Sequence, residues 1–320
     1  MIDMASATAP ASIGNVGVGF DVLGQAFDAA RDEVVAYRES LPGVRLGEVS
    51  GLVDSLPDSP ENNTALAAAK AVLDAAGADF GARLSIRKGV PISGGMGGSA
   101  ASAVAGAAAV NALLPRPFNT EDLLPFALAG ERVSSDPPPW DNVAASLFGG
   151  LAIVASEKPA FVYRLPAPVG ILSILFHPAI RVETASARRL LRPEVPMALA
   201  VEHSRRLAAF VAGCATGDLG LLRAGLEDLL VEPQREHLMP ALPAVKAAAL
   251  AAGALGCSFS GSGPSVFAWA LEEEAERVEQ AMAEAFRRCD LEARAYRAPV
   301  DSPGVRVERR RQPALADTRR

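Results

Sequence analysis

The sequence predicts a fold that mixes helices with strands and is divided into two domains, or one large domain with a subdivided core. The chain has 320 residues, more than one small module needs. Strand-like and helix-like patterns follow one another along its whole length. Half of the residues are apolar but only 5% are aromatic, so we expect a core built from Ala, Val and Leu.

Residues 1–165 are predicted to form the N-terminal domain, in which strand patterns end at turn residues. Asn62 and Asn63 are suitable caps for a helix that Gly77 would end. Three consecutive prolines make residues 134–140 a stiff loop. The expected strands cover residues 4–8, 33–38, 44–48, 82–87, 151–155 and 161–165, and the expected helices cover residues 64–76, 99–114 and 121–133.

Residues 166–308 are predicted to form the C-terminal domain, which is mostly helical at first and then returns to strands. Its last strands and helix follow the order typical of half a ferredoxin-like domain. The Arg-rich residues 309–320 are expected to form a flexible tail. The expected helices cover residues 184–191, 198–214, 219–230, 243–252 and 272–288, and the expected strands cover residues 171–176, 257–260, 265–270, 292–297 and 304–307.

The composition argues against several classes of protein. With 31 basic and 37 acidic residues the net charge is −6, so we expect no nucleic-acid and no membrane partner. The three cysteines are far apart and the three histidines lack zinc-ligand spacing, which disfavours a disulfide scaffold or a structural zinc site. The Ala-rich residues 100–114 are shorter than a membrane span, and the first residues lack a signal-peptide pattern. We therefore expect a cytoplasmic protein.

A glycine-rich turn between an expected strand and an expected helix is the strongest chemical feature. Glycines leave the backbone free to adopt positive φ and to expose its N–H groups, and the helix adds the positive end of its dipole. This combination is typical of a phosphate-binding loop, although a tight turn against a packed helix would use the same residues. The turn and the helix start contain Pro91, Gly94, Gly95, Met96, Gly97, Gly98, Ser99, Ala100 and Ala101.

Other glycine motifs fit this turn less well. A P-loop would contain Gly-Lys, a pair that the chain lacks. Gly95, Gly97 and Ala100 fit a dinucleotide-binding motif, but no acidic residue follows at the expected distance of about 20 positions. A nucleophilic Ser99 would need a glycine two residues later, where Ala101 stands. An oxidoreductase that binds NAD(P) is an alternative function, from another class of enzyme.

Two further glycine-rich segments lie near the ends of the chain. Residues 9–24, APASIGNVGVGFDVLG, hold Asn15 and Asp21 on a backbone rich in turn residues. Residues 260–267, SGSGPSVF, form a turn between two expected strands. Each segment alone is as typical of a hairpin or a loop as of a binding site.

In this order, the three segments resemble the three motifs of the GHMP small-molecule kinases, and the first is similar to that of the homoserine kinase family. Residues 141–150 (DNVAASLFGG), 184–188 (TASAR) and 232–235 (EPQR) extend the resemblance through most of the chain. It implies an α+β fold of two domains, a mixed α/β domain and a ferredoxin-like domain, with ATP between them. It also implies phosphorylation of the side-chain hydroxyl of L-homoserine with ATP and Mg²⁺, a step toward threonine.

The resemblance also implies roles for individual residues. Ser99 and Glu131 would be the metal ligands, a hydroxyl and a carboxylate as a hard cation prefers. Since phosphoryl transfer depends on positioning and charge neutralisation, Asp21 would orient the substrate, and a role as base stays open. The other implied contacts are Asn62 or Asn63 with adenine, Asn15 and Asp21 with the amino acid, Arg188 and Arg235 with its carboxylate, and Asp141, Asn142 and Thr184 with the reacting groups.

The sequence departs from the family pattern at three positions. Pro139 stands where the family usually has His, so one polar contact to the acceptor is missing or replaced. Gly98 replaces the usual Ser, and Val18 replaces a common Pro. Two rivals within the family follow: a kinase of another hydroxylated amino acid or small alcohol, and a homologue that binds nucleotide without catalysis. Family members are often homodimers, but no sequence feature identifies an interface.

Overall fold

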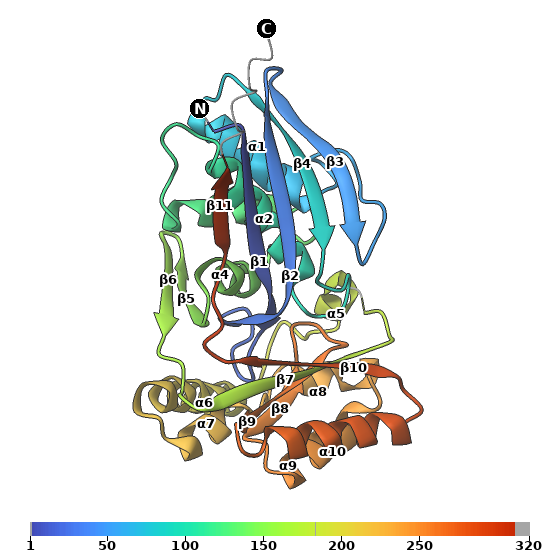
Figure 1. Ribbon diagram of the computed structural model, residues 1–320. Coiled ribbons are helices and arrows are strands. Elements are labelled where there is room, and N and C mark those ends of the chain that lie inside the picture. Colours follow the sequence, from blue (N-terminus) through green and yellow to red (C-terminus); the bar gives the residue numbers. More distant parts are fainter. Residues whose placement is uncertain (1, 183, 311–320) are drawn as a thin grey trace, which may run out of the picture.

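The computed structural model describes residues 2–182 and 184–310, which fold around two β-sheets (Figure 1). Within these residues the first sheet has seven strands in the order β11-β1-β2-β4-β3, with β5 on β2 and β6 on β5. Only β3 and β4 pair in parallel among them. The strands are β1 (Met4–Gly14), β2 (Leu23–Glu39), β3 (Gly43–Gly51), β4 (Gly81–Lys88), β5 (Leu151–Glu157), β6 (Ala160–Leu165) and β11 (Arg306–Arg310).

Helices pack against this sheet, with α2 on β1 and β2 and with α1 and α4 beside α2. The Oδ1 atom of Asn63 caps α1 by accepting a hydrogen bond from the Ala65 N–H at 3.0 Å, as predicted. From Ala100 onward every residue of α2 is buried, because small side chains let neighbouring elements approach it from all sides. The helices are α1 (Thr64–Ala76), α2 (Gly98–Asn111), the 3₁₀ helix η1 (Glu121–Leu123), α3 (Leu124–Glu131) and α4 (Trp140–Phe148).

The second sheet is antiparallel, with the strand order β10-β7-β9-β8. Helices α9 and α10 pack on it around a core that includes Ile174 and Phe286. This order confirms the predicted α+β fold with a ferredoxin-like half. The elements are β7 (Ile171–Pro178), β8 (Gly256–Phe259), β9 (Val266–Leu271), β10 (Ala293–Pro299), α5 (Thr184–Arg189), α6 (Met197–Thr216), α7 (Leu219–Gly225), α8 (Glu232–Arg235), the 3₁₀ helix η2 (Glu236–Leu238), α9 (Leu242–Ala251) and α10 (Ala275–Arg288).

A buried glutamine joins the two sheets. The Oε1 atom of Gln25, on β2, accepts hydrogen bonds from Ser173 Oγ at 3.1 Å and from Trp269 Nε1 at 2.9 Å. The division of the chain at residue 165 stays a prediction. That division assigns the start of β11 to the second domain. In the structure, β11 pairs with β1 of the first sheet.

The structure corrects several predicted boundaries. Strands β1 and β2 are longer than predicted, and α4 was not predicted at all. The helix expected over residues 121–133 is divided into η1 and α3, because Pro125 lies in the first turn of α3, where a proline is favoured. The helix expected over residues 219–230 ends at Gly225. Most of the predicted tail, residues 311–320, lies outside the described residues. Over residues 2–182 and 184–310, none of the helices combines the length and hydropathy that a membrane crossing requires.

Candidate active site

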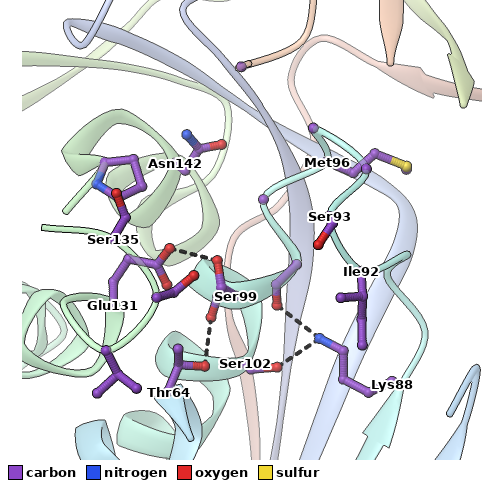
Figure 2. A pocket seen from close by; sticks show the side chains of 18 of the residues that line it. Thr64, Lys88, Ile92, Ser93, Met96, Ser99, Ser102, Glu131, Ser135 and Asn142 are labelled. Atoms are coloured by element: carbon purple, nitrogen blue, oxygen red, sulfur yellow. Dashed lines mark hydrogen bonds between the residues drawn. The ribbon is translucent and has the colours of Figure 1, made fainter. Parts of the chain in front are cut away.

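The glycine-rich turn lies between β4 and α2 and lines a pocket of about 330 Å³ (Figure 2). The backbone φ is positive at Gly95 (72°) and at Gly97 (64°), which is the N-cap of α2. Because Gly98 and Ser99 begin α2 and line the pocket, the unpaired N–H groups of this helix are available to a phosphate. Three of the predicted ATP-binding residues do not line the pocket: Pro91, and Ala100 and Ala101, which are buried in helix packing. Those that line it are Asn62, Asn63, Gly94, Gly95, Met96, Gly97, Gly98 and Ser99.

The other two glycine-rich segments meet this turn. The Ser12 N–H donates to the carbonyl oxygen of Met96 at 3.0 Å, and the Gly261 N–H donates to that of Gly14 at 3.0 Å. The Ser260 hydroxyl donates to the carbonyl oxygen of Gly95 at 2.5 Å. Segments from the start, the middle and the end of the chain therefore form one site.

We expect the substitution Gly95→Ala to weaken the binding of Mg·ATP about tenfold, since displaced amides bind phosphate poorly. An alanine Cβ at this position would lie 2.5 Å from the carbonyl oxygen of Ser260 and would take a strained φ. Isothermal titration calorimetry measures the change. Gly170→Ala is the matched control, because Gly170 has a φ of 74° with nothing within 4 Å of its Cβ position. Equal losses in both variants would contradict a role for the turn.

The side chains of Ser99 and Glu131 meet at the pocket wall (Figure 2). The Ser99 hydroxyl donates to Glu131 Oε1 at 2.6 Å, while the buried Oε2 atom has no hydrogen-bond partner. Burial raises the pKa of Glu131 to about 7, against the smaller lowering effects of the Ser99 hydrogen bond and the Lys88 charge. Among the described residues no group of three or more His, Cys, Asp and Glu side chains has the arrangement of a metal site. Glu131 and Ser99 present oxygen atoms of the kind that a hard cation prefers as ligands.

Asn15 and Asp21 lie between β1 and β2, where both have a left-handed backbone with φ of 71° and 57°. The Asn15 side chain accepts from the Asp21 N–H at 3.2 Å and donates to the Gly261 carbonyl oxygen at 2.8 Å. The Asn15 N–H donates to Asp141 Oδ2 at 2.9 Å. Such a strained backbone persists because contacts on several sides fix it.

Asp141 and Asn142 lie in the first turn of α4. Burial, and next the charge of Asp21, raise the pKa of Asp141 to about 6. The Asn142 side chain accepts from the Ser12 hydroxyl at 2.9 Å, donates to Asp141 Oδ1 at 3.2 Å and lines the pocket. The start of α4 therefore connects the phosphate turn with the Asn15 loop.

Two arginines predicted to bind the acceptor carboxylate, Arg188 and Arg235, lie near the Phe20 ring, at 5.5 and 5.4 Å from its centre. Arg188 forms an ion pair with Asp21 through two hydrogen bonds of 2.8 Å. Arg235 is buried and donates from Nε to the carbonyl oxygen of Ala187 at 3.1 Å. Burial and the charge of Arg188 lower the pKa of Arg235 to about 10, so it is a cation at neutral pH. Two predicted substrate ligands, Asp21 and Arg188, are thus each other's partners here.

Buried acidic side chains hold the short helix that carries Arg235. Asp228 accepts hydrogen bonds from the N–H groups of three residues at the start of α8, among them Glu232 at 2.8 Å. Glu232 forms an ion pair with Lys246 and accepts from the Ser258 hydroxyl at 2.5 Å. The glutamate of the EPQR segment is therefore a structural support for the arginine.

Of the remaining predicted residues, Asn62 and Asn63 line the pocket. Asn63 uses its side chain to cap α1 and to donate to the Pro57 carbonyl oxygen at 2.8 Å, while Asn62 is exposed. Pro139 precedes α4 and lines the pocket. Helix α5 begins at Thr184, whose side chain lies outside the described part of the structure.

The chain matches the family model of the GHMP kinases N terminal domain over residues 63–150 and that of the GHMP kinases C terminal domain over residues 208–288. A homoserine kinase of Xylella fastidiosa is 41% identical over 304 residues, which cover 95% of this chain and 94% of that protein. The chain belongs to the homoserine kinase family. A homoserine kinase of Chlorobium phaeobacteroides is 38% identical over 93% of this chain and 98% of that protein.

The fold agrees with this membership in the homoserine kinase family. The crystal structure of a homoserine kinase from Cytophaga hutchinsonii matches with a TM-score of 0.92 and 38% identity, over 96% of this chain and 98% of that one. The L. major mevalonate kinase, 16% identical with a TM-score of 0.63 over 93% of this chain and 95% of that one, shares the fold. The family confirms the predicted class of ATP-dependent small-molecule kinase.

The sequence motifs missed two charged residues beneath the phosphate turn, Asp32 on β2 and Lys88 at the end of β4. Both are buried and ion-paired. A lone charge in a strand pattern usually faces solvent, so the sequence carries no signal for them. Ser12 was also missed, although it stands inside the first motif, which is the signal that would have identified it.

Proposed function

We propose that this member of the homoserine kinase family transfers the γ-phosphoryl group of ATP to the side-chain hydroxyl of L-homoserine. The observation that carries the proposal is the Ser99–Glu131 contact beside the phosphate turn in one pocket. Relatives named homoserine kinase, 38–41% identical over most of the chain, support the choice of acceptor. The products would be ADP and O-phospho-L-homoserine.

The residues of the pocket fit a Mg²⁺ ion, because Glu131 Oε2 is a buried oxygen without a protein partner. We propose Ser99 and Glu131 as the protein ligands of the ion. When bound, Mg²⁺ neutralises negative charge on the phosphates. The amides of the turn and of the first turn of α2 bind the phosphate oxygens, and they need no rearrangement because the backbone already holds them there.

On the acceptor side, an amino acid would replace the Asp21–Arg188 ion pair with ion pairs of its own. Its ammonium group pairs with Asp21, and its carboxylate pairs with Arg188 and Arg235. Asp141 and Asn142 orient the hydroxyl. The hydroxyl oxygen bonds to the γ-phosphorus as the bond from that phosphorus to the β,γ-bridging oxygen breaks, and the hydroxyl proton passes to solvent water. The loose transition state requires positioning rather than a strong base.

The test is an assay of coupled ADP release with homoserine, threonine, serine, small alcohols and no acceptor, with the product mass determined. We expect kcat/KM for homoserine to exceed that for every other acceptor by about 100-fold or more. Preference for another hydroxylated compound would instead reassign the acceptor, as Pro139 at the pocket suggests. Binding of Mg·ATP without turnover of any acceptor would show a non-catalytic homologue.

The affinity for Mg·ATP is expected to rise with pH. Only the ionised carboxylate of Glu131 binds a cation, and with a pKa raised to about 7 its ionised fraction grows from about one tenth at pH 6 to about nine tenths at pH 8. The dissociation constant at saturating Mg²⁺ should therefore fall about tenfold between these pH values. Calorimetry in buffers of different ionisation enthalpy would also detect the released proton. The variant Glu131→Gln is the control, and a pH dependence of the same size in this variant would contradict the assignment.

A further inference from the structure

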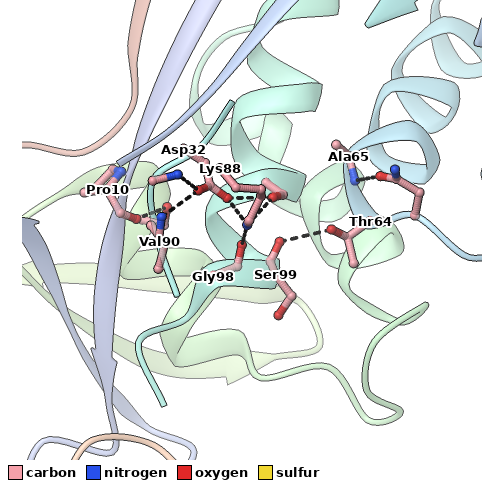
Figure 3. Close-up of polar contacts among 12 residues, drawn as sticks. Pro10, Asp32, Thr64, Ala65, Lys88, Val90, Gly98 and Ser99 are labelled. Atoms are coloured by element: carbon pink, nitrogen blue, oxygen red, sulfur yellow. Dashed lines mark hydrogen bonds and ion pairs between the residues drawn. The ribbon is translucent and has the colours of Figure 1, made fainter. Parts of the chain in front are cut away.

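A buried cluster of three polar side chains contacts both ends of the phosphate turn, and Figure 3 labels two of them, Asp32 and Lys88. Asp32 of β2 and Lys88 of β4 form an ion pair, with their side chains 0% and 4% exposed. The hydroxyl of Ser102, in the second turn of α2, donates to Asp32 Oδ2 at 2.6 Å. We refer to these three residues as the Asp32–Lys88 cluster. No role in nucleotide binding follows from the sequence motifs for any of them.

The two charged members of the cluster bind opposite ends of the turn. Asp32 Oδ1 accepts hydrogen bonds from the N–H groups of Gly89 and Val90, each at 3.0 Å, where the chain leaves β4. Lys88 Nζ donates to the carbonyl oxygen of Gly98 at 2.9 Å, where α2 begins. The ion pair between them therefore fixes the entry of the turn relative to its exit.

Stability alone is a poor explanation for this arrangement. Removing two charges from water is costly, and well-packed apolar residues at a buried pair are often as stable or more stable. The surrounding core is rich in alanine and valine, so apolar packing is the local rule. Lys88 and Ser102 also line the nucleotide pocket, so the cluster borders the site itself.

We propose that Asp32, Lys88 and Ser102 are positioning residues that hold the amides of residues 94–98 in the geometry that binds the phosphates of ATP. The inference rests on the proposed function, because it concerns the same nucleotide site. The cluster acts through the backbone at both ends of the turn, and it does not touch the acceptor side. Its loss should therefore change nucleotide binding and leave acceptor binding intact.

The double variant Asp32→Asn, Lys88→Met tests the proposal without leaving a buried charge unpaired. The asparagine oxygen still accepts from the N–H groups at the entry, whereas the methionine no longer holds the exit. We expect the dissociation constant and KM for Mg·ATP to rise about tenfold or more. The KM for the acceptor should stay within about twofold of the original. Lys88→Arg, which keeps the charge and the donors, should recover most of the affinity.

The selective rise in the KM for Mg·ATP is a readout that a merely structural role would not give, because general destabilisation lowers the amount of active enzyme and does not single out one substrate. The control is the double variant Glu279→Gln, Arg297→Met, which removes an ion pair between α10 and β10 whose residues do not line the pocket. It should leave the Mg·ATP affinity unchanged.

Two results would overturn the proposal. One is unchanged Mg·ATP affinity in the Asp32→Asn, Lys88→Met variant. The other is an equal loss of affinity in the control pair, which would indicate general destabilisation. Calorimetry without acceptor separates this failure from failure of the proposed function. If the original chain binds no Mg·ATP, the proposed function fails. If it binds and the variants bind equally well, only the positioning role fails.

Discussion

Replacement of Glu131 by glutamine is expected to lower kcat about a thousandfold. Glutamine preserves the volume of the side chain and an oxygen that accepts from the Ser99 hydroxyl, the bond of 2.6 Å in the structure. It removes the negative charge that a divalent cation needs at Oε2, the buried oxygen without a partner. Steady-state assays of ADP release at saturating homoserine and Mg·ATP measure the loss.

The control for this substitution is Glu121→Gln, on the exposed side of η1. It removes the same charge from the same part of the chain and should leave kcat unchanged. Circular dichroism and thermal unfolding establish that both variants are folded. A kcat for Glu131→Gln within about tenfold of the original would show that this carboxylate does not hold the cation.

The phosphate turn was predictable because its signal is local. Several glycines between a strand and a helix reveal a backbone with positive φ and exposed amides, and the structure has positive φ at Gly95 and Gly97. The cap at Asn63 is local for the same reason. Helix α4 was missed, because the three prolines that end at Pro139 indicate a loop. Prolines also permit a helix to begin at the next residue, Trp140. The pattern does not distinguish a loop that continues from a helix that begins there.

The contacts that assemble the site were not predictable in this way. Asp32 and Lys88 are 56 positions apart, and Asp21 and Arg188 are 167 positions apart. Neither residue of such a pair changes the periodicity of its own segment, so pairing appears only when the sheets bring distant segments together. The family resemblance implied that Asp21 and Arg188 bind the substrate, but it did not show that these two side chains form an ion pair with each other in the free protein.

Replacement of Arg235 by methionine is expected to raise the KM for homoserine about 100-fold and to leave the KM for Mg·ATP unchanged. Arg235 is a buried cation beside Arg188, and methionine fills similar space without a charge or a donor. The acceptor carboxylate would lose one of its two arginines. The carbonyl oxygen of Ala187 would also lose its donor, so Arg188 would be held less firmly. Initial rates over a matrix of homoserine and ATP concentrations separate the two KM values.

Two further variants separate the effect of the Arg235 charge from the effect of its structural role. Arg235→Lys keeps the charge but loses the planar pair of donors, so it should recover only part of the affinity for homoserine. Arg223→Met is the matched control, because Arg223 also donates to a backbone carbonyl, that of Ala254 at 3.0 Å, but belongs to α7 and to no predicted ligand set. An increase in the KM for Mg·ATP as large as that for homoserine in Arg235→Met would contradict the assignment. It would mean that α8 supports both the nucleotide site and the acceptor site. A selective change in the KM for homoserine follows only if the guanidinium of Arg235 binds the acceptor.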